Sequence, residues 1–466
     1  MELKSNNVDV GEPRGCLVSI STKPTDSRAR RPAGKNARLG RHDLAFSELR
    51  GESDLGHNHT GITRHMAKRH QFGVDFVSRI RRIQEIIMAN SGVDEFYEII
   101  RLILAKYFAE GDGHADLPNK AICNRLLTEH GPQIAFILDG VLELQTPDSI
   151  FDEVRRILGM TSIRGQDFTA LDQAFEQLTS RSYKADKGQY FTPRHVIDMC
   201  VEAVDPKPDE TVCDPACGSA AFLKSAHSYS TEKYGRAAGL FGFDYSHRAC
   251  QVAKVVSLIG TKGAITVEQV DGLRLPERNL LNQADETIES LMGPSFSGFD
   301  VILTNPPFAG DVSAETFATS YDVAKASGKR LERDVLFIER CIRLLKVGGR
   351  LAIVLPDNKV SSRVFRDVRL WLGKNCEIRA VVSLHRYTFL PYTSQKAAVI
   401  FAIKQAPALS PYDSEVHFFR SDSAGKSSNG SPVYRRDADA EAPAYKSLDH
   451  DLEQIAPRIR SVICAG

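Results

Sequence analysis

The chain has 466 residues, of which 42% are apolar, and its formal net charge is only +1. This length allows two to three domains with ample cores. The small charge means that any binding of nucleic acid must use a local basic patch or a partner. No apolar run approaches membrane-spanning length, and we expect no secretory signal. The nine cysteines lack the spacing of a zinc site, so we expect buried thiols, no bound metal and a cytoplasmic location.

The N-terminal part of the chain changes character near residue 66. Residues 1–65 are polar, and the segment 28–41 is basic without an acid, which predicts a disordered basic tail; contact with nucleic acid is the alternative to a solvated tail. Residues 66–180 are predicted to form a helical domain, because apolar residues recur there with helical spacing. Two faces carry this prediction: Phe76, Ile80, Ile83 and Ile87, then Phe96, Ile99, Ile100, Ile103, Leu104 and Tyr107.

Residues 181–406 alternate strands with helices, which predicts an α/β domain. Its first strand, 210–214, runs into a turn of small residues and then a helix. Gly218, Ser219 and Ala220 let the backbone approach a ligand closely at the helix N-terminus. The turn holds a single glycine, so it is not the G-x-G-x-x-G fingerprint of dinucleotide binding.

Two further strands, 239–244 and 264–270, each lead to an acid, Asp244 and Asp271. Asp244 lies about thirty residues after Asp214, and an acid in that place can accept both hydroxyls of a ribose in the neighbouring crevice. Alternatively, Asp244 caps the helix that follows it.

The strand 299–304 ends in the turn Asn305-Pro306-Pro307-Phe308. The Asn305 amide oxygen and a proline carbonyl both accept hydrogen bonds, neither proline carries an N–H, and Phe308 offers a flat surface. Together they fit a planar group that presents an NH₂, such as the exocyclic amine of a base. Because ligands bind at the carboxyl edge of an open α/β sheet, we expect this turn to lie in a row with the three strand-end acids.

The segments after this turn are less specific. The polar stretch 309–330 is predicted to be a lid beside the site. Further along, Phe389 or Tyr392 either stacks on a target base or simply packs. Residues 407–466 are predicted to be a polar C-terminal tail, with a linker over 421–432.

Four segments carry a resemblance to a known family, namely Gly188–Pro193, Asp214–Leu223, Asn305–Phe308 and Gly348–Pro356. Over residues 70–405 the chain resembles the class I S-adenosylmethionine-dependent amino-methyltransferases. Among these, it resembles the modification subunits of type I DNA restriction–modification systems. Ala220 and Ala221 stand where the family usually has glycines, and we expect the turn to tolerate one extra methyl group at each. The resemblance implies a Rossmann-like sheet preceded by an all-α domain.

The resemblance also implies a cofactor, S-adenosyl-L-methionine, and the residues that bind it. Its methionine end would be lined by Gln189, Tyr190, Phe191, Thr192, Pro193 and Arg194. Thr192 and Pro193 agree with this as an N-cap followed by proline at N1, a helix end that favours a carboxylate, although a plain cap is the alternative. Further contacts would come from Asp214, Gly218, Ser219 and Ala220 in the turn, from Asp244 at the ribose and from Asp271 near the adenine amine.

The activity that the resemblance implies is methylation of the N6 amine of adenine in double-stranded DNA. Asn305 and the Pro306 carbonyl would accept from that amine, and Phe308 would stack on the base, which must be flipped out of the duplex. A separate specificity subunit is expected, with two copies of this chain per specificity chain and with a restriction subunit in some systems. It would dock on the helical domain or the C-terminal tail. Two alternatives stay open: a methyltransferase acting on RNA or on a protein glutamine, and a non-catalytic DNA-binding scaffold.

Overall fold

The protein was analysed as a computed structural model, which describes residues 76–159, 161–164, 170–171, 173–175, 178, 191–276, 286–308, 310–312, 320–326, 331–406, 415–435 and 444–464. All of them belong to one compact unit, Gly56–Gly466. The predicted tail over 1–65 lies outside the described residues. The predicted domain boundaries at residues 66, 181 and 407 stay predictions.

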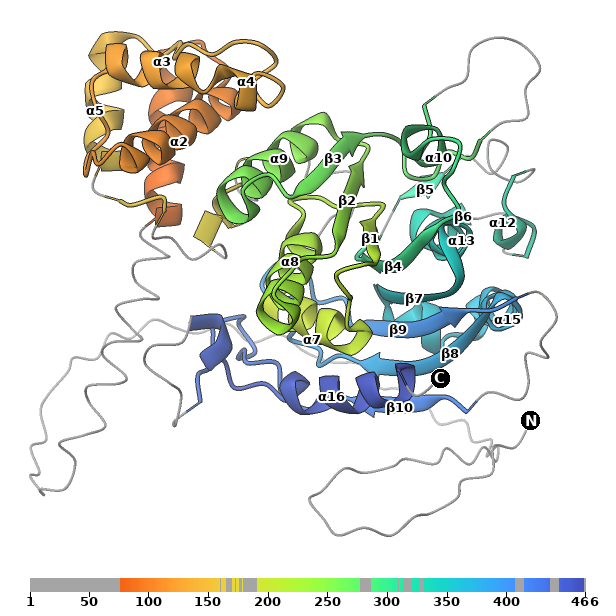
Figure 1. The fold of residues 1–466 in the computed structure, drawn as a ribbon. Coiled ribbons are helices and arrows are strands. Elements are labelled where there is room, and N and C mark those ends of the chain that lie inside the picture. Colours follow the sequence, from red (N-terminus) through yellow and green to blue (C-terminus); the bar gives the residue numbers. More distant parts are fainter. Residues whose placement is uncertain are drawn as a thin grey trace, which may run out of the picture. The chain divides into compact units, whose positions relative to one another are not determined.

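An eight-stranded sheet forms the centre of this unit (Figure 1). Its strands are β1 (Thr211–Asp214), β2 (Gly239–Asp244), β3 (Ile265–Gln269), β4 (Phe299–Thr304), β7 (Leu345–Pro356), β8 (Cys376–Ser383), β9 (Ala397–Lys404) and β10 (His417–Arg420). Their order is β10-β8-β9-β7-β4-β1-β2-β3. The two pairings of β9 are antiparallel and the others are parallel. This sheet, with helices around it and a helical region before it, confirms the predicted fold class.

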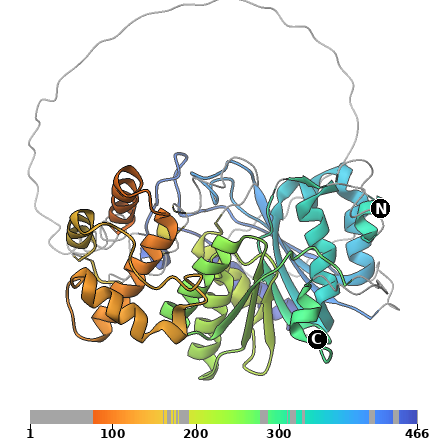
Figure 2. The same ribbon diagram turned by 90° about the horizontal axis from the view of Figure 1, so that it is seen from above.

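Helices cover both faces of the sheet, so the strands lie between two helical layers (Figure 2). One layer holds α7 (Arg194–Val204), α8 (Ala221–Tyr234) and α16 (Leu452–Ile463). The other holds α10 (Ile288–Met292), α12 (Asp322–Ala326), α13 (Arg333–Leu344) and α15 (Arg366–Asn375). Side chains alternate along a strand, so Ala352 and Val354 of β7 join the first core while Leu351 and Ile353 join the second.

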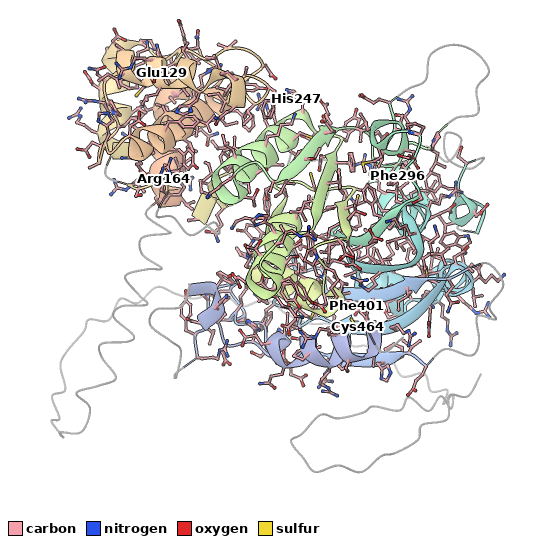
Figure 3. The ribbon with its side chains drawn as sticks, viewed as in Figure 1. Glu129, Arg164, His247, Phe296, Phe401 and Cys464 are labelled. Atoms are coloured by element: carbon pink, nitrogen blue, oxygen red, sulfur yellow. The ribbon has the colours of Figure 1, made fainter. Side chains whose placement is uncertain are left out.

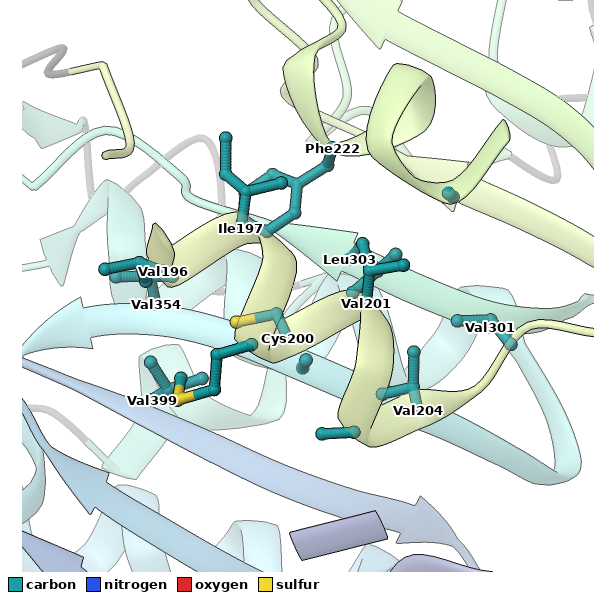
Figure 4. Packing of buried hydrophobic residues seen from close by; sticks show 14 of the residues in the cluster. Val196, Ile197, Cys200, Val201, Val204, Phe222, Val301, Leu303, Val354 and Val399 are labelled. Atoms are coloured by element: carbon teal, nitrogen blue, oxygen red, sulfur yellow. The ribbon is translucent and has the colours of Figure 1, made fainter. Parts of the chain in front are cut away.

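The first of these cores is built around α7 (Figure 4). Its buried face carries Val196, Cys200, Val201 and Val204, and these side chains pack on the strand residues Val301, Leu303, Val354 and Val399. The helix is therefore fixed against the centre of the sheet, and its N-terminus is held at a constant position relative to the strand ends.

Short elements complete the sheet region. The two-residue strands β5 (Asp311–Val312) and β6 (Leu331–Glu332) pair antiparallel. Helix α14 (Asp357–Ser361) and the 3₁₀ turn η1 (Arg363–Phe365) follow β7, and η2 (Ala444–Ser447) precedes α16. No helix among the described residues has both the length and the apolar character that crossing a bilayer requires.

The helical region before the sheet consists of a helix over residues 76–90, then α2 (Glu95–Gly111), α3 (Lys120–Glu129), α4 (Gly131–Ile134) and α5 (Asp148–Gly159). Of the ten residues on its two predicted apolar faces, nine are buried and Tyr107 is half-buried.

This region packs on helix α9 (His247–Thr261) of the α/β part. Val252, Val255 and Val256 of α9 belong to its hydrophobic core. At the rim of this contact the Asp139 carboxylate lies 3.1 Å from Nε2 of His247, labelled in Figure 3, and accepts from Gln251 Nε2 at 2.9 Å. One face of the helical region is thus already covered within the chain.

The C-terminal segment differs from the predicted polar tail and linker. β10 adds a strand parallel to β8, and isolated bridges pair Ala424 with His450 and Tyr434 with Leu448. Helix α16 packs on α7 with one apolar face, made of Leu452, Ile455, Ala456, Ile459 and Ile463. The polar average of the segment hid this helical spacing, so the linker prediction was wrong.

Replacing Ile459 by alanine should lower the free energy of unfolding by about 2–5 kcal/mol, because the side chain is fully buried between α16 and the sheet core. Chemical denaturation with Val462→Ala as the control would test this, since Val462 lies on the same helix but is only partly buried. Equal effects of the two changes would show that α16 is not docked through this face.

Candidate active site

The carboxyl ends of four neighbouring strands form one edge of the sheet. The spatial order β3-β2-β1-β4 places Asp271, Asp244, Asp214 and Asn305 along this edge in that sequence, because each follows or ends a parallel strand. From β1 the chain continues to β2, which lies on one side of β1, whereas β4 lies on its other side. The edge is therefore a topological switch point, where open α/β sheets bind ligands.

Asp214 joins the ends of β1 and β4. Its Oδ1 accepts from the Thr304 hydroxyl at 2.7 Å and from the Ala216 backbone N–H at 3.1 Å. The side chain is buried, and burial raises the pKa of Asp214 to about 7, with the nearby Asp244 carboxylate adding to the rise and the two hydrogen bonds opposing it. Asp214 is thus a fixed support of the turn that follows it.

This raised pKa gives a pH-dependent prediction. Between about pH 4 and about pH 7 the folded chain keeps a proton on Asp214 that the unfolded chain releases, so the free energy of unfolding should fall as the pH rises through this range. Asp214→Asn should flatten this slope, by at most about 1.4 kcal/mol per pH unit. Urea denaturation of both proteins at several pH values would measure it, and parallel pH profiles would contradict the prediction.

The small-residue turn after Asp214 forms as predicted from its composition. Gly218 has φ +52°, and a Cβ placed there would meet nothing within 4 Å, so the backbone is open on that side. Ala220 also has a positive φ, +62°, a conformation that costs a non-glycine residue roughly 1–2 kcal/mol. The turn nevertheless closes, with the Ala220 N–H donating to the Cys217 carbonyl at 2.7 Å.

Asp244 at the end of β2 reaches across to this turn. Its Oδ2 accepts from the Gly218 N–H at 3.0 Å, and its Oδ1 accepts from the Ser246 N–H at 2.8 Å. The N-cap of α9 is Ser246, whose hydroxyl accepts from the Ala249 N–H. The alternative interpretation of Asp244 as the helix cap is therefore wrong, because the carboxylate bridges two strand ends instead.

The segment predicted to line the methionine end is described in part. Gln189 and Tyr190 lie outside the described residues, whereas Phe191, Thr192 and Pro193 lead directly into α7. Pro193 occupies the N-cap position rather than N1. Its carbonyl accepts from the N–H groups of Val196 and Ile197, three and four residues further along, at 2.9 and 3.1 Å. Thr192 is therefore not the cap that we predicted.

Arg194 is the first residue of α7. Its guanidinium lies 5.8 Å from the centre of the Tyr445 ring, so the C-terminal segment contacts the start of this helix. Helix α7 thus begins where the sequence predicted a helix start, and a helix N-terminus favours negative charge.

The Asn-Pro-Pro-Phe turn follows β4 directly. Asn305 is half-buried and Pro306 is buried. The Phe308 ring is only 8% exposed and packs edge-to-face on Phe389, with ring centres 5.7 Å apart. Of the two aromatic candidates downstream, Phe389 is core and Tyr392 is 40% exposed. Of the predicted lid, 309–330, residues 309, 313–319 and 327–330 lie outside the described residues, so the lid stays a prediction.

Sequence reasoning missed three residues at this edge. Tyr245 follows Asp244 and is 65% exposed, and an aromatic directly after a strand-end acid is a signal that could have been noticed. Thr304, the last residue of β4, lies directly before Asn305, and its hydroxyl donates to Asp214. Arg340 is fully buried in α13 and donates to the Gly272 carbonyl at 2.7 Å, which no local pattern indicates.

Comparison with known proteins agrees with this architecture. The chain is 28% identical over 229 residues to the type I restriction enzyme EcoEI methylase subunit of Escherichia coli, covering 47% of this chain and 43% of that relative. It therefore spans less than half the length of this relative.

Two solved structures share the fold. One is the type I restriction-modification system methyltransferase subunit from Streptococcus thermophilus, at 17% identity and TM-score 0.50, covering 87% of this chain and 97% of that one. The other is a Listeria monocytogenes protein assigned to the class I S-adenosylmethionine-dependent methyltransferases, at 14% identity and TM-score 0.52, covering 84% and 99%. The family model described as N-6 DNA Methylase matches residues 167–456, more than half of the chain. With its sheet order and its strand-end residues, this match shows that the chain belongs to the N-6 DNA methylase family.

Proposed function

We propose that this chain is the modification subunit of a type I-like restriction–modification system. It transfers a methyl group from S-adenosyl-L-methionine to the N6 amine of adenine in double-stranded DNA. The observation that carries this proposal is the row of Asp271, Asp244, Asp214 and Asn305 along one sheet edge in a member of the N-6 DNA methylase family. Three acids fit the hydroxyls and amine of a nucleoside cofactor, and the Asn-Pro-Pro-Phe turn fits a second amine.

The residues of the edge fit this cofactor. The turn at Gly218 is open on one side, and Asp244 Oδ2 accepts from the Gly218 N–H, so the carboxylate lies beside this turn, where it would accept from ribose hydroxyls. Asp271 would accept from the cofactor's adenine amine, and the start of α7 would receive its carboxylate. The cofactor supplies an electrophilic methyl group on sulfur when it is bound.

The target side needs no covalent chemistry from the protein. The lone pair of an adenine amine is delocalised into the ring, which makes the amine a poor nucleophile. Acceptance of its two N–H bonds by Asn305 and by the Pro306 carbonyl favours a pyramidal nitrogen with a localised lone pair. Fixed acceptors that favour the reacting geometry lower the barrier through positioning and electrostatics. Phe308, supported from behind by the buried Phe389, would provide the apolar surface beside this point.

A partner is needed to read the DNA sequence. The net charge of +1 gives the chain little general affinity for DNA, and base-specific contacts require side chains in the major groove. The C-terminal segment is packed on α7, and one face of the helical region is covered by α9. We therefore expect a separate specificity subunit, which binds two copies of this chain on their remaining exposed surfaces.

The test is methyl transfer from labelled S-adenosyl-L-methionine to duplex DNA, RNA and protein, followed by digestion of the products to nucleosides or amino acids. Label in N6-methyladenine, and only when a specificity subunit is present, is the expected result. Label on cytosine, guanine, RNA or glutamine would refute the proposed substrate. Efficient methylation of one defined site by the chain alone would refute the need for a partner.

Tyr245 gives a further prediction for the cofactor. Its ring is exposed just after β2, so we expect it to stack on the cofactor's adenine, and stacking contributes about 1–3 kcal/mol. Tyr245→Ala should therefore weaken cofactor binding measured by calorimetry, whereas Tyr245→Phe should preserve it. An alanine variant with the affinity of the original chain would exclude this role.

A further inference from the structure

Two consecutive peptide groups hold Asp271 in place. The Leu273 N–H donates to Asp271 Oδ1 at 3.0 Å, and the Arg274 N–H donates to the Asp271 backbone carbonyl at 2.9 Å. The first bond sets the direction of the carboxylate and the second closes the turn. The aim of Asp271 therefore depends on how these two peptide planes are oriented.

The opposite ends of the same two peptide groups are held by buried side chains. The Gly272 carbonyl, which shares a peptide plane with the Leu273 N–H, accepts from Arg340 Nε at 2.7 Å. The Leu273 carbonyl, which shares a plane with the Arg274 N–H, accepts from the Tyr321 hydroxyl at 2.5 Å. Because a peptide group is planar, a bond that fixes its C=O also fixes its N–H.

The two donors are themselves rigid. Arg340 is fully buried, and its Nη1 and Nη2 donate to the two oxygens of Glu289 at 2.6 and 2.8 Å. Tyr321 is also fully buried, with the Arg343 guanidinium 5.3 Å from its ring centre. Burying an arginine is costly unless its donors are all used. Here the third nitrogen of the guanidinium, Nε, donates to a single backbone carbonyl at the cofactor edge.

Gly272 connects this arrangement to the turn after β1. A Cβ on Gly272 would lie 2.4 Å from the Pro215 carbonyl oxygen, so the Asp271 turn packs directly on the residue that follows Asp214. The Gly272 peptide is thus confined on one side by the Asp214 turn and on the other by Arg340. A shift of Arg340 would therefore change the orientation of this peptide, because Arg340 Nε holds its carbonyl.

We infer that Arg340 and Tyr321 are positioning residues, which aim the Asp271 carboxylate at the adenine amine of the bound cofactor. This inference rests on the proposed function, since it assigns Asp271 to that amine. Both side chains are fully buried, so neither needs to touch the cofactor for this role. Both act through the peptide groups of residues 272–274, with Glu289 holding Arg340 in place.

The test compares two ligands that differ at the amine and at the ring nitrogen next to it. S-Adenosylhomocysteine carries the amine, whereas the hypoxanthine analogue, S-inosylhomocysteine, has a carbonyl oxygen in its place and a hydrogen on N1. The dissociation constant of S-inosylhomocysteine divided by that of S-adenosylhomocysteine reports how well the Asp271 carboxylate is directed at the amine. Tyr321→Phe and Arg340→Lys should each reduce this ratio by roughly three- to tenfold, as expected for a misplaced hydrogen bond. In an Asp271→Ala background neither change should alter the ratio further.

Tyr229→Phe is the matched control. It removes a tyrosine hydroxyl that donates to Asp205 at 2.8 Å, next to the C-terminus of α7 and away from the strand-end acids, and it should leave the ratio unchanged. Equal weakening of both ligands by Tyr321→Phe and Arg340→Lys, with an unchanged ratio, would overturn the inference and leave the two residues as supports of the fold. A starting chain that binds neither ligand would instead refute the proposed cofactor. A starting chain that binds both equally would refute the assignment of Asp271 on which the inference depends.

Discussion

Asn305→Ala is expected to abolish methyl transfer while leaving cofactor binding close to intact. Asn305 follows β4, on the far side of β1 from the ends of β2 and β3 that would hold the cofactor's nucleoside. Without its amide oxygen one N–H of the target amine has no acceptor, and the nitrogen stays conjugated with the ring. Loss of one such fixed polar contact costs about 10²–10³ in rate, so transfer by the variant should fall at least to the background of the labelling assay at short reaction times.

Asn305→Asp is the informative companion to this variant. A carboxylate of the same shape still accepts a hydrogen bond, so measurable transfer should remain. Calorimetry with S-adenosylhomocysteine would confirm that both variants bind the cofactor, and a labelled-methyl assay in the presence of the specificity subunit would measure transfer. Full activity in a folded Asn305→Ala chain would remove this residue from the mechanism, and loss of cofactor affinity would move it to the cofactor side.

Asp244→Ala should produce the largest loss of cofactor affinity. The carboxylate would contribute charge-assisted hydrogen bonds to the ribose, each worth about 1.5–3 kcal/mol. It also holds the Gly218 N–H at 3.0 Å, so its removal loosens the turn that faces the cofactor. Two ribose bonds of this strength correspond to a loss of roughly 10²-fold or more in affinity, which titration calorimetry can follow.

Asp300→Ala is the matched control for Asp244. Asp300 is also a strand carboxylate, and it accepts from the Thr211 N–H and from Lys346 Nζ, but it lies near the start of β4 at the opposite edge of the sheet. Its loss should lower stability without changing the affinity for the cofactor. If Asp244→Ala behaves like this control, with a less stable fold and unchanged affinity, Asp244 is a structural bridge and the ribose needs another acceptor.

Local sequence was sufficient to predict the row of residues along the sheet edge. β2 and β4 have the predicted bounds, because buried parallel strands are short apolar runs and their ends are marked by Asp244 and by the Asn305 turn. Once strands alternate with helices, their carboxyl ends must share an edge. The helical faces before the sheet followed from periodicity in the same way.

Tertiary structure decided how those residues are supported. Whether Asp244 caps its helix or reaches Gly218 depends on the distance between two strands, and helix propensity alone favours neither outcome. The C-terminal helix docks on α7, although its segment is polar on average, because only one of its faces needs to be apolar.

The contact between Arg340 and Gly272 joins residues 68 positions apart in the sequence. Its strength comes from burial and from the planarity of one peptide group. Neither property is present in a chain segment until the sheet and α13 have brought the two residues together, so sequence periodicity carries no trace of it.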